Sequence, residues 1–479
     1  MPATINKLIA KLLIFVVFAG GCAVGSHTGT GPEPRDFAYT KPPGTNDGWH
    51  TASVSDVGLD SHKIDKLLSD IHNGDLKNIY AVVVVKDGLL VVDEYFNGAN
   101  RTHIGLIAST TKSIVSLLLG IALDESTSNK SVKTPLRDFF PKYSDRFPSD
   151  EKGAITLYHA LTMTAGMDWD ENTFPHPHER NPNTQMYTVA DPVGFILDRD
   201  FHSPPGKRWN YNSGLSVLLG EVVRRLSGEY IDVFAERRLF NPLQFARYQW
   251  GRHADGTIWA NGDLYIRPRD LAKVGQLVLN KGKWQGQQIV SKDWIIESTS
   301  PQTQARHGFN YGYQWWLGTA RYAERRLDVI FGSGTGGQKL FIIPEVDMVV
   351  VVISKVFGNK GGQARATWVL TDYVLPAALP TIKHKSYILD TLFANAAVGK
   401  YYNATDDQMV RIGKSGSTLY AKPTFFSRFE LKPLNRKSFY GHWDPIGDVY
   451  IDFVENERGD VIAADVDYLL GTMNFRKTH

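Results

Sequence analysis

The sequence predicts an α+β fold in which an antiparallel sheet carries a helical subdomain and is followed by a small C-terminal all-β, barrel-like domain. Two segments rich in β-branched residues, 79–96 and 339–354, have the pattern of hairpins, and mostly helical patterns separate them. From about His384 the pattern changes to short alternating segments punctuated by Gly, Asn and Asp. This change is typical of a separate all-β domain, which we assign to residues 384–479.

The N-terminus has the features of an exported protein. A short apolar run, residues 12–18, follows two lysines and is too short to span a bilayer. Small residues then precede Cys22, the only cysteine of the chain, and resemble a bacterial lipoprotein cleavage site. We therefore expect a lipoprotein-type signal peptide over 1–22, lipidation at Cys22 and a membrane-anchored protein on the periplasmic side of the cell envelope. An ordinary secretory signal is the alternative, because Ala19 stands where lipoproteins usually have Leu. Residues 23–52 have the composition of a flexible tether.

The composition and the absence of certain motifs argue against several classes of function for this protein. The chain has 479 residues and a formal net charge of +3, a balance too weak to indicate a nucleic-acid partner. It contains no GxxxxGK[ST] and no strand-linked GxGxxG, so nucleotide binding has no support. It contains neither HExxH nor paired Cys/His spacings. We expect no metal and no cofactor.

The first domain, residues 53–383, begins with a predicted hairpin. Residues 79–96 form two apolar runs around a Lys-Asp-Gly turn. A nearly continuous apolar segment, 112–123, then predicts a helix that is buried on most sides. Further helices are predicted at 213–230 and 267–284, the latter with a proline at its start. The second hairpin follows at 339–354.

A serine and a lysine stand three residues apart where the buried helix begins. Ser109, Thr110 and Thr111 occupy the N-cap region, so a capped core helix is one interpretation. Lys112, however, is costly there, because lysine is rarely buried without a partner and the positive end of the helix dipole disfavours a cation. Residues three apart share a helix face, so Lys112 can reach the Ser109 hydroxyl. The second interpretation is therefore a nucleophile with a base, since a desolvated lysine can accept a proton.

Two later segments can complete such a site. Tyr211, Asn212 and Ser213 precede the helix predicted at 213–230, a pattern that by itself is also typical of a capped helix. Residues 332–337 are Gly or Ser except for Thr335 and lead into the second hairpin. A glycine-rich strand edge lets a substrate approach the backbone closely, and a flexible hairpin end is the alternative.

In this order, the S-x-x-K, Y-x-[NS] and glycine-rich motifs resemble those of the serine β-lactamase and penicillin-binding-protein superfamily. The resemblance is strongest to its class C β-lactamase-like branch, which includes esterases and 6-aminohexanoate-dimer hydrolases. The stretches HALTMTAGMDWDE (159–171) and YIRPRDLAKVGQLVLNKGKWQGQQIVS (265–291) also resemble this branch. The similarity covers about residues 58–379, and the C-terminal segment resembles the small barrel often appended there. It implies a β-lactamase-like sheet with a helical subdomain.

The resemblance implies a serine hydrolase that cleaves ester or amide bonds through an acyl-enzyme on Ser109. Lys112 would take the Ser109 proton or share it with Tyr211, which would pass it to the leaving group and later activate water. The Ser109 N–H would supply one oxyanion donor and the segment 334–338 the second. The residues implied to bind substrate or oxyanion are Ser213, Gly334, Thr335, Gly336, Gly337 and Gln338.

Two departures from the superfamily bear on the substrate, a small ester or amide molecule. Ser213 stands where the second motif commonly has Asn. The third motif, Gly334-Thr335-Gly336, lacks the Lys or His that helps antibiotic-directed members hold a substrate carboxylate. We therefore expect ester or linear amide hydrolysis to exceed β-lactam hydrolysis, unless Lys339 or Arg306 supplies the charge. The alternatives are a β-lactamase or D-Ala-D-Ala carboxypeptidase, a catalytically weak penicillin-binding-like sensor, and an envelope binding protein acting through the C-terminal domain.

Overall fold

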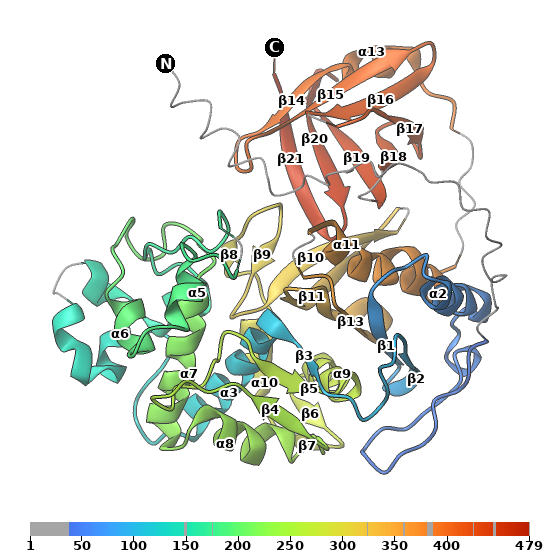
Figure 1. Cartoon of the computed structure of the whole chain (residues 1–479). Helices are drawn as coiled ribbons and strands as arrows, with labels where there is room; N and C mark the ends of the chain where they lie inside the picture. The colour runs from blue at the N-terminus through green and yellow to red at the C-terminus, as the bar shows by residue number, and fades with distance from the viewer. Residues whose placement is uncertain are drawn as a thin grey trace, which may run out of the picture.

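The computed structural model describes residues 38–147, 151–174, 176–322, 324–357, 360–380, 387–424, 426–443 and 447–478. An antiparallel sheet with helices on both faces carries a helical subdomain, and a closed barrel follows at the C-terminal end (Figure 1). The predicted α+β fold with a C-terminal all-β domain is confirmed. The predicted signal peptide, Cys22 and the first half of the predicted tether, residues 23–37, lie outside the described residues. Within the described part of the chain, every helix is too short or too polar to cross a membrane.

The main sheet has eight strands in the order β2-β1-β13-β12-β11-β10-β9-β8. Its strands are β1 (Ile79–Lys86), β2 (Leu89–Tyr95), β8 (Thr303–Gln304), β9 (Asn310–Tyr311), β10 (Trp316–Tyr322), β11 (Arg325–Gly334), β12 (Gln338–Ile343) and β13 (Met348–Ser354). Both predicted hairpins are present, as β1–β2 and β12–β13. They meet because β1 pairs with β13, so segments from the two ends of the domain form the centre of the sheet.

Each central strand is buried on both faces, which explains its continuous β-branched sequence. Successive side chains point to opposite faces. Val83 and Val351 belong to the core shared with α3, α7 and α9, whereas Val82 and Val352 belong to the core shared with α2 and η9. The sheet therefore separates two hydrophobic cores.

The helices follow the predicted pattern of an insertion between the two hairpins. The α-helices of this domain are α2 (Ser61–Asn73), α3 (Thr111–Glu125), α4 (Leu157–Leu161), α5 (Pro182–Met186), α6 (Pro192–Leu197), α7 (Ser213–Ser227), α8 (Ile231–Ala235), α9 (Pro268–Leu279), α10 (Lys292–Ser298), α11 (Lys360–Trp368) and α12 (Leu375–Ala378). Shorter helical turns are η2 (Ser55–Val57), η3 (Ala108–Thr110), η4 (Leu136–Phe139), η5 (Pro141–Arg146), η6 (Glu151–Ala154), η7 (Glu236–Phe240), η8 (Pro344–Val346) and η9 (Val369–Val374). Two small sheets complete the domain: β3 (Gly105–Leu106) with β5 (Leu264–Ile266) and β4 (Tyr248–Trp250), and β6 (Lys283–Trp284) with β7 (Gln287–Gln288).

The start of α3 differs from the interpretation in which Ser109 is a side-chain N-cap. The chain enters α3 through the 3-10 turn η3, and Thr110, the residue before the helix, is itself helical and makes no side-chain cap. The Thr111 hydroxyl instead donates to the carbonyl oxygen of Ala108 at 2.6 Å. The capping interpretation of Ser109 is therefore wrong, and the preceding 3-10 turn is the physical reason, because it already carries the backbone into the helix.

The last residues of the predicted tether pack on the hydrolase domain. Trp49 is buried, and its indole N–H donates to the carbonyl oxygen of Arg269 on α9 at 3.2 Å. The buried Arg269 guanidinium pairs with Asp47 at 2.8 Å and with Asp93 of β2 at 2.9 Å. The P-R-D-L-A segment of α9 thus belongs to a buried ion network that fixes the chain before β1.

The C-terminal domain is a closed antiparallel barrel of eight strands. Its strands are β14 (Gly399–Asn403), β15 (Gln408–Ser415), β16 (Thr418–Pro423), β17 (Phe429–Pro433), β18 (Ser438–Trp443), β19 (Gly447–Glu455), β20 (Val461–Tyr468) and β21 (Gly471–Thr478). Helix α13 (Thr391–Ala397) precedes them and packs its Phe393 into the barrel core. Closure pairs β14 with β21, so the barrel has no free edge strand.

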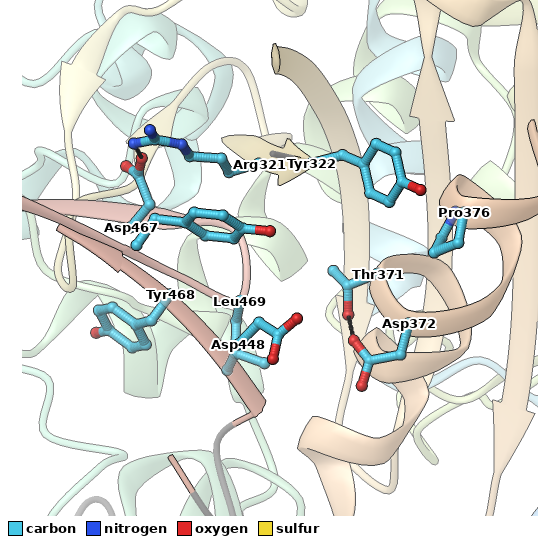
Figure 2. Close-up of a pocket in the computed structure, with 10 residues that line it drawn as sticks. Arg321, Tyr322, Thr371, Asp372, Pro376, Asp448, Asp467, Tyr468 and Leu469 are labelled. Atoms are coloured by element: carbon cyan, nitrogen blue, oxygen red, sulfur yellow. Dashed lines mark hydrogen bonds and ion pairs between the residues drawn. The ribbon is translucent and has the colours of Figure 1, made fainter. Parts of the chain in front are cut away.

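The barrel docks on strands β10 and β11 through charged residues. Arg321 pairs with Asp452 and Asp467 of the barrel, and Arg326 reaches the same two carboxylates. The Thr319 N–H donates to the carbonyl oxygen of Leu470 at 2.9 Å. Beside these contacts lies a pocket of about 220 Å³, shown in Figure 2, which Arg321, Asp467, Asp448 and Asp372 help to line. None of its lining residues belongs to the predicted active site.

Candidate active site

Ser109 and Lys112 are in direct contact. The Lys112 Nζ donates to the Ser109 hydroxyl oxygen at 3.0 Å, as their spacing predicts. Ser109 is half-buried at the end of the sheet, whereas Lys112 is 1% exposed. The hydroxyl is therefore within reach of a ligand, and the amine beside it is shielded from water.

The surroundings of Lys112 explain how a buried amine is accommodated. Its Nζ also donates to the carbonyl oxygen of Asn261 at 2.7 Å and lies 5.1 Å from the centroid of the Tyr211 ring. Among the described residues, no carboxylate lies within 4.0 Å of Nζ. Two hydrogen-bond acceptors and an aromatic ring therefore satisfy the buried amine and hold it beside the Ser109 hydroxyl.

The backbone immediately before Ser109 adopts an uncommon conformation. Ala108 has a φ of 45°, in the left-handed region that residues with a side chain rarely occupy. Such conformations cost of order 1–3 kcal/mol and are found disproportionately at functional sites. Here the turn presents Ser109 at the start of α3, between β3 and the buried helix.

Tyr211 precedes α7 and lies in an aromatic cluster. Its ring stacks on Trp316 of β10, with centroids 5.9 Å apart and an angle of 25° between the planes. Trp209 contacts both rings, with centroid distances of 6.1 Å to Tyr211 and 5.6 Å to Trp316. Asn212 caps α7, because its side-chain oxygen accepts from the Leu215 N–H at 3.2 Å. The cap and the stacking fix the tyrosine ring next to Lys112.

Ser213 lies against Glu171. Its N–H donates to Glu171 Oε2 at 3.0 Å, and its hydroxyl donates to Oε1 at 2.9 Å. The Trp169 indole N–H donates to Oε2 at 2.6 Å. A carboxylate at the N-terminus of α7 is stabilised by the free N–H groups and the helix dipole. Ser213 is thus buried in a structural contact at the position where the superfamily commonly has Asn.

The glycine-rich segment approaches Ser109 through the end of β11. A Cβ added to Gly334 would lie 2.3 Å from the carbonyl oxygen of Ile107, and one added to Gly332 would lie 2.7 Å from the Thr110 methyl group. Strand β10 pairs with β11 only as far as Phe331, so the edge of residues 332–334 is open on that side. An open strand edge beside a nucleophile can receive the backbone of a substrate.

The rest of the predicted third motif forms the turn between β11 and β12. Thr335 is exposed there, and the nearest atoms to Cβ positions on Gly336 and Gly337 belong to Phe357 and Ser354. The Gln338 amide donates to the carbonyl oxygen of Ser354 at 2.6 Å. Of the predicted segment, the structure therefore brings Gly334 closest to the turn that carries Ser109.

The two cations named as substitutes for the missing Lys or His differ in position. Lys339 donates to the Ser333 hydroxyl at 2.8 Å, and burial lowers its pKa to about 8. Ser333 and Lys339 alternate along their strands with Gly334 and Gln338, so they lie on the face of the sheet opposite the Ser109 turn. Arg306, between β8 and β9, lies on the Tyr211 side and donates to the Asn172 side-chain oxygen at 2.6 Å.

Four groups in the site lie outside the three predicted motifs. They are the left-handed Ala108, the carbonyl group of Asn261, the carboxylate of Glu171 and the ring of Trp316. Each acts through its backbone or through a long-range contact, and a sequence pattern reports neither. Among the described residues there is no cluster of three His, Cys, Asp or Glu side chains that could hold a metal ion.

Comparisons with known proteins identify the family of the chain. The beta-lactamase family model matches residues 79–373, more than half of the chain. The 6-aminohexanoate-dimer hydrolase of Paenarthrobacter ureafaciens is 24% identical over 299 residues, which are 57% of this chain and 72% of that enzyme. The matched family segment includes all three predicted motifs.

Solved structures show the same fold at low identity. The octameric penicillin-binding protein homologue from Pyrococcus abyssi matches with a TM-score of 0.50 and 17% identity, covering 86% of this chain and 100% of that one. EstCE1, a hydrolase with promiscuous acyltransferase activity, matches with a TM-score of 0.52 and 13% identity, covering 67% of this chain and 100% of that one. The predicted relation to the serine β-lactamase and penicillin-binding-protein superfamily is confirmed: the chain belongs to the beta-lactamase family and is a hydrolase of that fold.

Proposed function

We propose that this protein is a serine hydrolase that cleaves ester or linear amide bonds of small molecules through an acyl-enzyme on Ser109. The observation that carries the proposal is the contact of the Lys112 amine with the Ser109 hydroxyl at 3.0 Å. Because the same amine lies 5.1 Å from the Tyr211 ring centroid, one buried lysine connects a nucleophile with a second group that can carry a proton.

Acylation begins with attack of the Ser109 oxygen on the carbonyl carbon of the substrate. Lys112 accepts the hydroxyl proton as the new C–O bond forms, and the carbonyl π electrons move to oxygen. Collapse of this tetrahedral intermediate breaks the bond to the leaving group. Tyr211 passes it a proton, which Lys112 replaces. The products of this half are the acyl-enzyme and a free alcohol or amine.

The oxyanion of the intermediate is stabilised by backbone N–H groups. The Ser109 N–H, at the start of the η3–α3 helix, is the first donor, because free N–H groups at a helix N-terminus favour negative charge. The second comes from the segment 334–338, next to the open edge of β11. Deacylation repeats the sequence with water as nucleophile. Tyr211 takes a proton from the water as it passes its own to Lys112, and Lys112 returns a proton to the Ser109 oxygen when the acyl bond breaks.

The charges near the site indicate which type of substrate bond is cleaved best. The curated relative acts, by its name, on a 6-aminohexanoate dimer, which contains a linear amide. Gly334-Thr335-Gly336 offers no cation to a β-lactam carboxylate, and a charge-assisted hydrogen bond to such a group is worth roughly 1.5–3 kcal/mol. Lys339 is directed to Ser333 on the opposite face of the sheet. We therefore infer that acyclic esters and amides are better substrates than β-lactam antibiotics.

The first experiment tests the nucleophile. A fluorophosphonate probe should label the wild-type protein, and Ser109→Ala should abolish labelling while its circular dichroism stays unchanged. Ser116→Ala is the matched control, because this serine lies on α3 and its buried hydroxyl has no hydrogen-bond partner among the described residues. Equal labelling of Ser109→Ala would refute the assignment.

A substrate panel tests the reaction. We expect p-nitrophenyl butyrate or a 6-aminohexanoate dimer to exceed nitrocefin in kcat/KM by at least about tenfold, roughly 1.4 kcal/mol. A preference for nitrocefin would favour the β-lactamase alternative. A single burst without steady turnover of any substrate would favour the sensor.

We also propose that the mature protein is anchored to the cell envelope through a lipid on Cys22 and faces the periplasm. The support is the sequence of the first 22 residues, with its short apolar run and small residues before a single cysteine.

A further inference from the structure

The wall of the C-terminal barrel carries opposite charges on its two sides. Strands β14, β15 and β16 contain four Lys or Arg residues and no Asp or Glu, whereas β19 and β20 contain five Asp or Glu residues and no Lys or Arg. In a closed barrel of eight strands, β15 and β16 are four strands away from β19 and β20 and therefore lie on the opposite side. The barrel is thus polarised in charge across its axis.

The acidic side already has a partner within the chain. Arg321 and Arg326 of the main sheet bind Asp452 of β19 and Asp467 of β20. Figure 1 shows helix α13 and strands β14–β16 on the side of the barrel that is away from the hydrolase domain. The cationic side is therefore directed to the surroundings of the protein.

The two ends of strand β14 give the orientation of the barrel. Beyond its C-terminal end, Asp406 accepts at 3.0 Å from the N–H of His307, the residue after Arg306, so this end lies against the hydrolase domain. Before its N-terminal end stands α13, which packs Phe393 into the barrel core. Helix α13 therefore covers the end of the barrel that is far from the hydrolase domain.

Three of the four cations form a row across neighbouring strands, which we call the cationic row. Lys400 lies directly opposite Arg411, and Arg411 lies directly opposite Lys422. All three residues are exposed, and among the described residues no carboxylate lies within 4.0 Å of their charged groups. Like charges directly opposite each other in a sheet are destabilising. The row therefore weakens the barrel by itself, whereas an anionic partner would offset its repulsion.

Exposed apolar side chains lie at the α13 end of the same side. Ile388 is 91% exposed and Leu392 is 80% exposed, more than any other large apolar side chain among the described residues. Leu392 shares a face of α13 with Asn395, whose side-chain oxygen accepts from the Lys414 Nζ at 2.8 Å. Apolar side chains next to several cations are typical of a surface that binds the headgroup region of an anionic bilayer.

We propose that the cationic side of the barrel and the exposed end of α13 bind the surface of an anionic lipid bilayer. Lys400, Arg411 and Lys422 contact lipid phosphates, and Leu392 inserts among the headgroups. The proposed lipid on Cys22 would hold the chain beside such a surface. The barrel contact does not depend on it, because the groups involved all belong to the folded C-terminal domain.

Co-sedimentation with vesicles tests the proposal on residues 23–479, a chain that lacks the predicted signal peptide and keeps every described residue. Binding to phosphatidylcholine vesicles with about a quarter phosphatidylglycerol should exceed binding to phosphatidylcholine alone by about 100-fold or more. The combined change Lys400→Gln, Arg411→Gln and Lys422→Gln should weaken binding to the acidic vesicles by about 100-fold, because each cation near such a surface contributes about fivefold. Leu392→Gln should weaken it by about tenfold through the loss of apolar contact.

The matched control removes three exposed cations of the hydrolase domain, by Lys133→Gln, Arg247→Gln and Lys283→Gln, and changes the net charge equally. This variant should bind acidic vesicles like wild type, and both triple variants should keep the wild-type circular dichroism. Equal losses in the two triple variants, or equal binding to the two kinds of vesicle, would overturn the proposal. Binding of soluble dextran sulfate without binding of vesicles would likewise refute a lipid partner. Because the measurement needs no turnover, an error in the Ser109 assignment would leave its result unchanged.

Discussion

Replacing Gly334 with alanine should damage the active site without a conformational penalty from the backbone itself. Gly334 has no positive φ, so alanine can adopt its backbone angles. The new methyl group, however, would lie 2.3 Å from the carbonyl oxygen of Ile107 and 3.0 Å from the Ala108 and Gln338 Cβ atoms. Its closest obstacle is backbone two residues before Ser109, which cannot rotate away as the end of a side chain can.

The size of the effect follows from this distance. Moving from 2.3 Å to at least 3.0 Å requires a shift of about 0.7 Å between β11 and the Ser109 turn. Misplacement of a reacting group by about 1 Å can cost roughly 100-fold in rate. We therefore expect Gly334→Ala to lower kcat/KM for p-nitrophenyl butyrate by about 30- to 100-fold. Overpacking should also cost about 1–3 kcal/mol of folding stability.

Alanine substitutions at two other glycines provide a milder variant and a neutral control. At Gly332 the obstacle is the methyl group of Thr110, at 2.7 Å, so Gly332→Ala should have a smaller effect. Gly413, on barrel strand β15, has nothing within 4 Å of an added Cβ and serves as the neutral control. Steady-state kinetics and thermal unfolding are measured on all three variants. Wild-type kcat/KM in Gly334→Ala would refute the packing argument.

Three further predictions concern other parts of the chain. Asp93→Asn should lower the free energy of unfolding in urea by about 3 kcal/mol, because the buried Arg269 loses a partner at 2.9 Å; a loss below about 1 kcal/mol would contradict a structural role. Lys339 has a pKa of about 8 in the folded protein against 10.5 as its ordinary value, so below pH 8 its charge carries a burial cost that disappears as pH rises from 8 to 10.5. Lys339→Met should therefore raise Tm at pH 7. Between pH 8 and 10 the Tm of the wild-type protein should rise relative to that of the variant, and a constant difference between the two Tm curves would contradict this. Cys22→Ser should move the protein from the membrane fraction to the periplasm, which fractionation and immunoblotting measure; a wild-type protein that is already soluble and uncleaved at Cys22 would exclude lipidation.

The sequence predicted the fold well because its strongest signals are local or periodic. The β-branched runs that form β1 and β13 are buried on both faces, and such burial produces the continuous apolar pattern that marks them. The alternation after residue 384 likewise reflects strands with one face in a barrel core. The contact of Ser109 with Lys112 was predictable for the same reason, since residues three apart in a helix share a face.

Side-chain capping was one of two interpretations of the Ser109 segment, and the sequence signal for it is ambiguous. Ser109, Thr110 and Thr111 are all good N-cap residues, yet the chain is already helical at Thr110. Composition cannot distinguish an N-cap from a 3-10 turn that leads into a helix. The same ambiguity affected the tether, where a Gly- and Pro-rich composition includes Asp47 and Trp49, which pack on α9.

The sequence by itself determined the sheet, the helix that carries Ser109 and Lys112, and the presence of a second, all-β domain, because periodicity and spacing along the chain encode them. Only the tertiary structure decided which distant groups complete the site. The Asn261 carbonyl that binds Lys112, the Gly334 edge that meets the Ser109 turn and the Arg306 turn held by the barrel all depend on contacts between segments far apart in the chain. Such contacts depend on how the two cores and the barrel pack together, and no local pattern of residues predicts that packing.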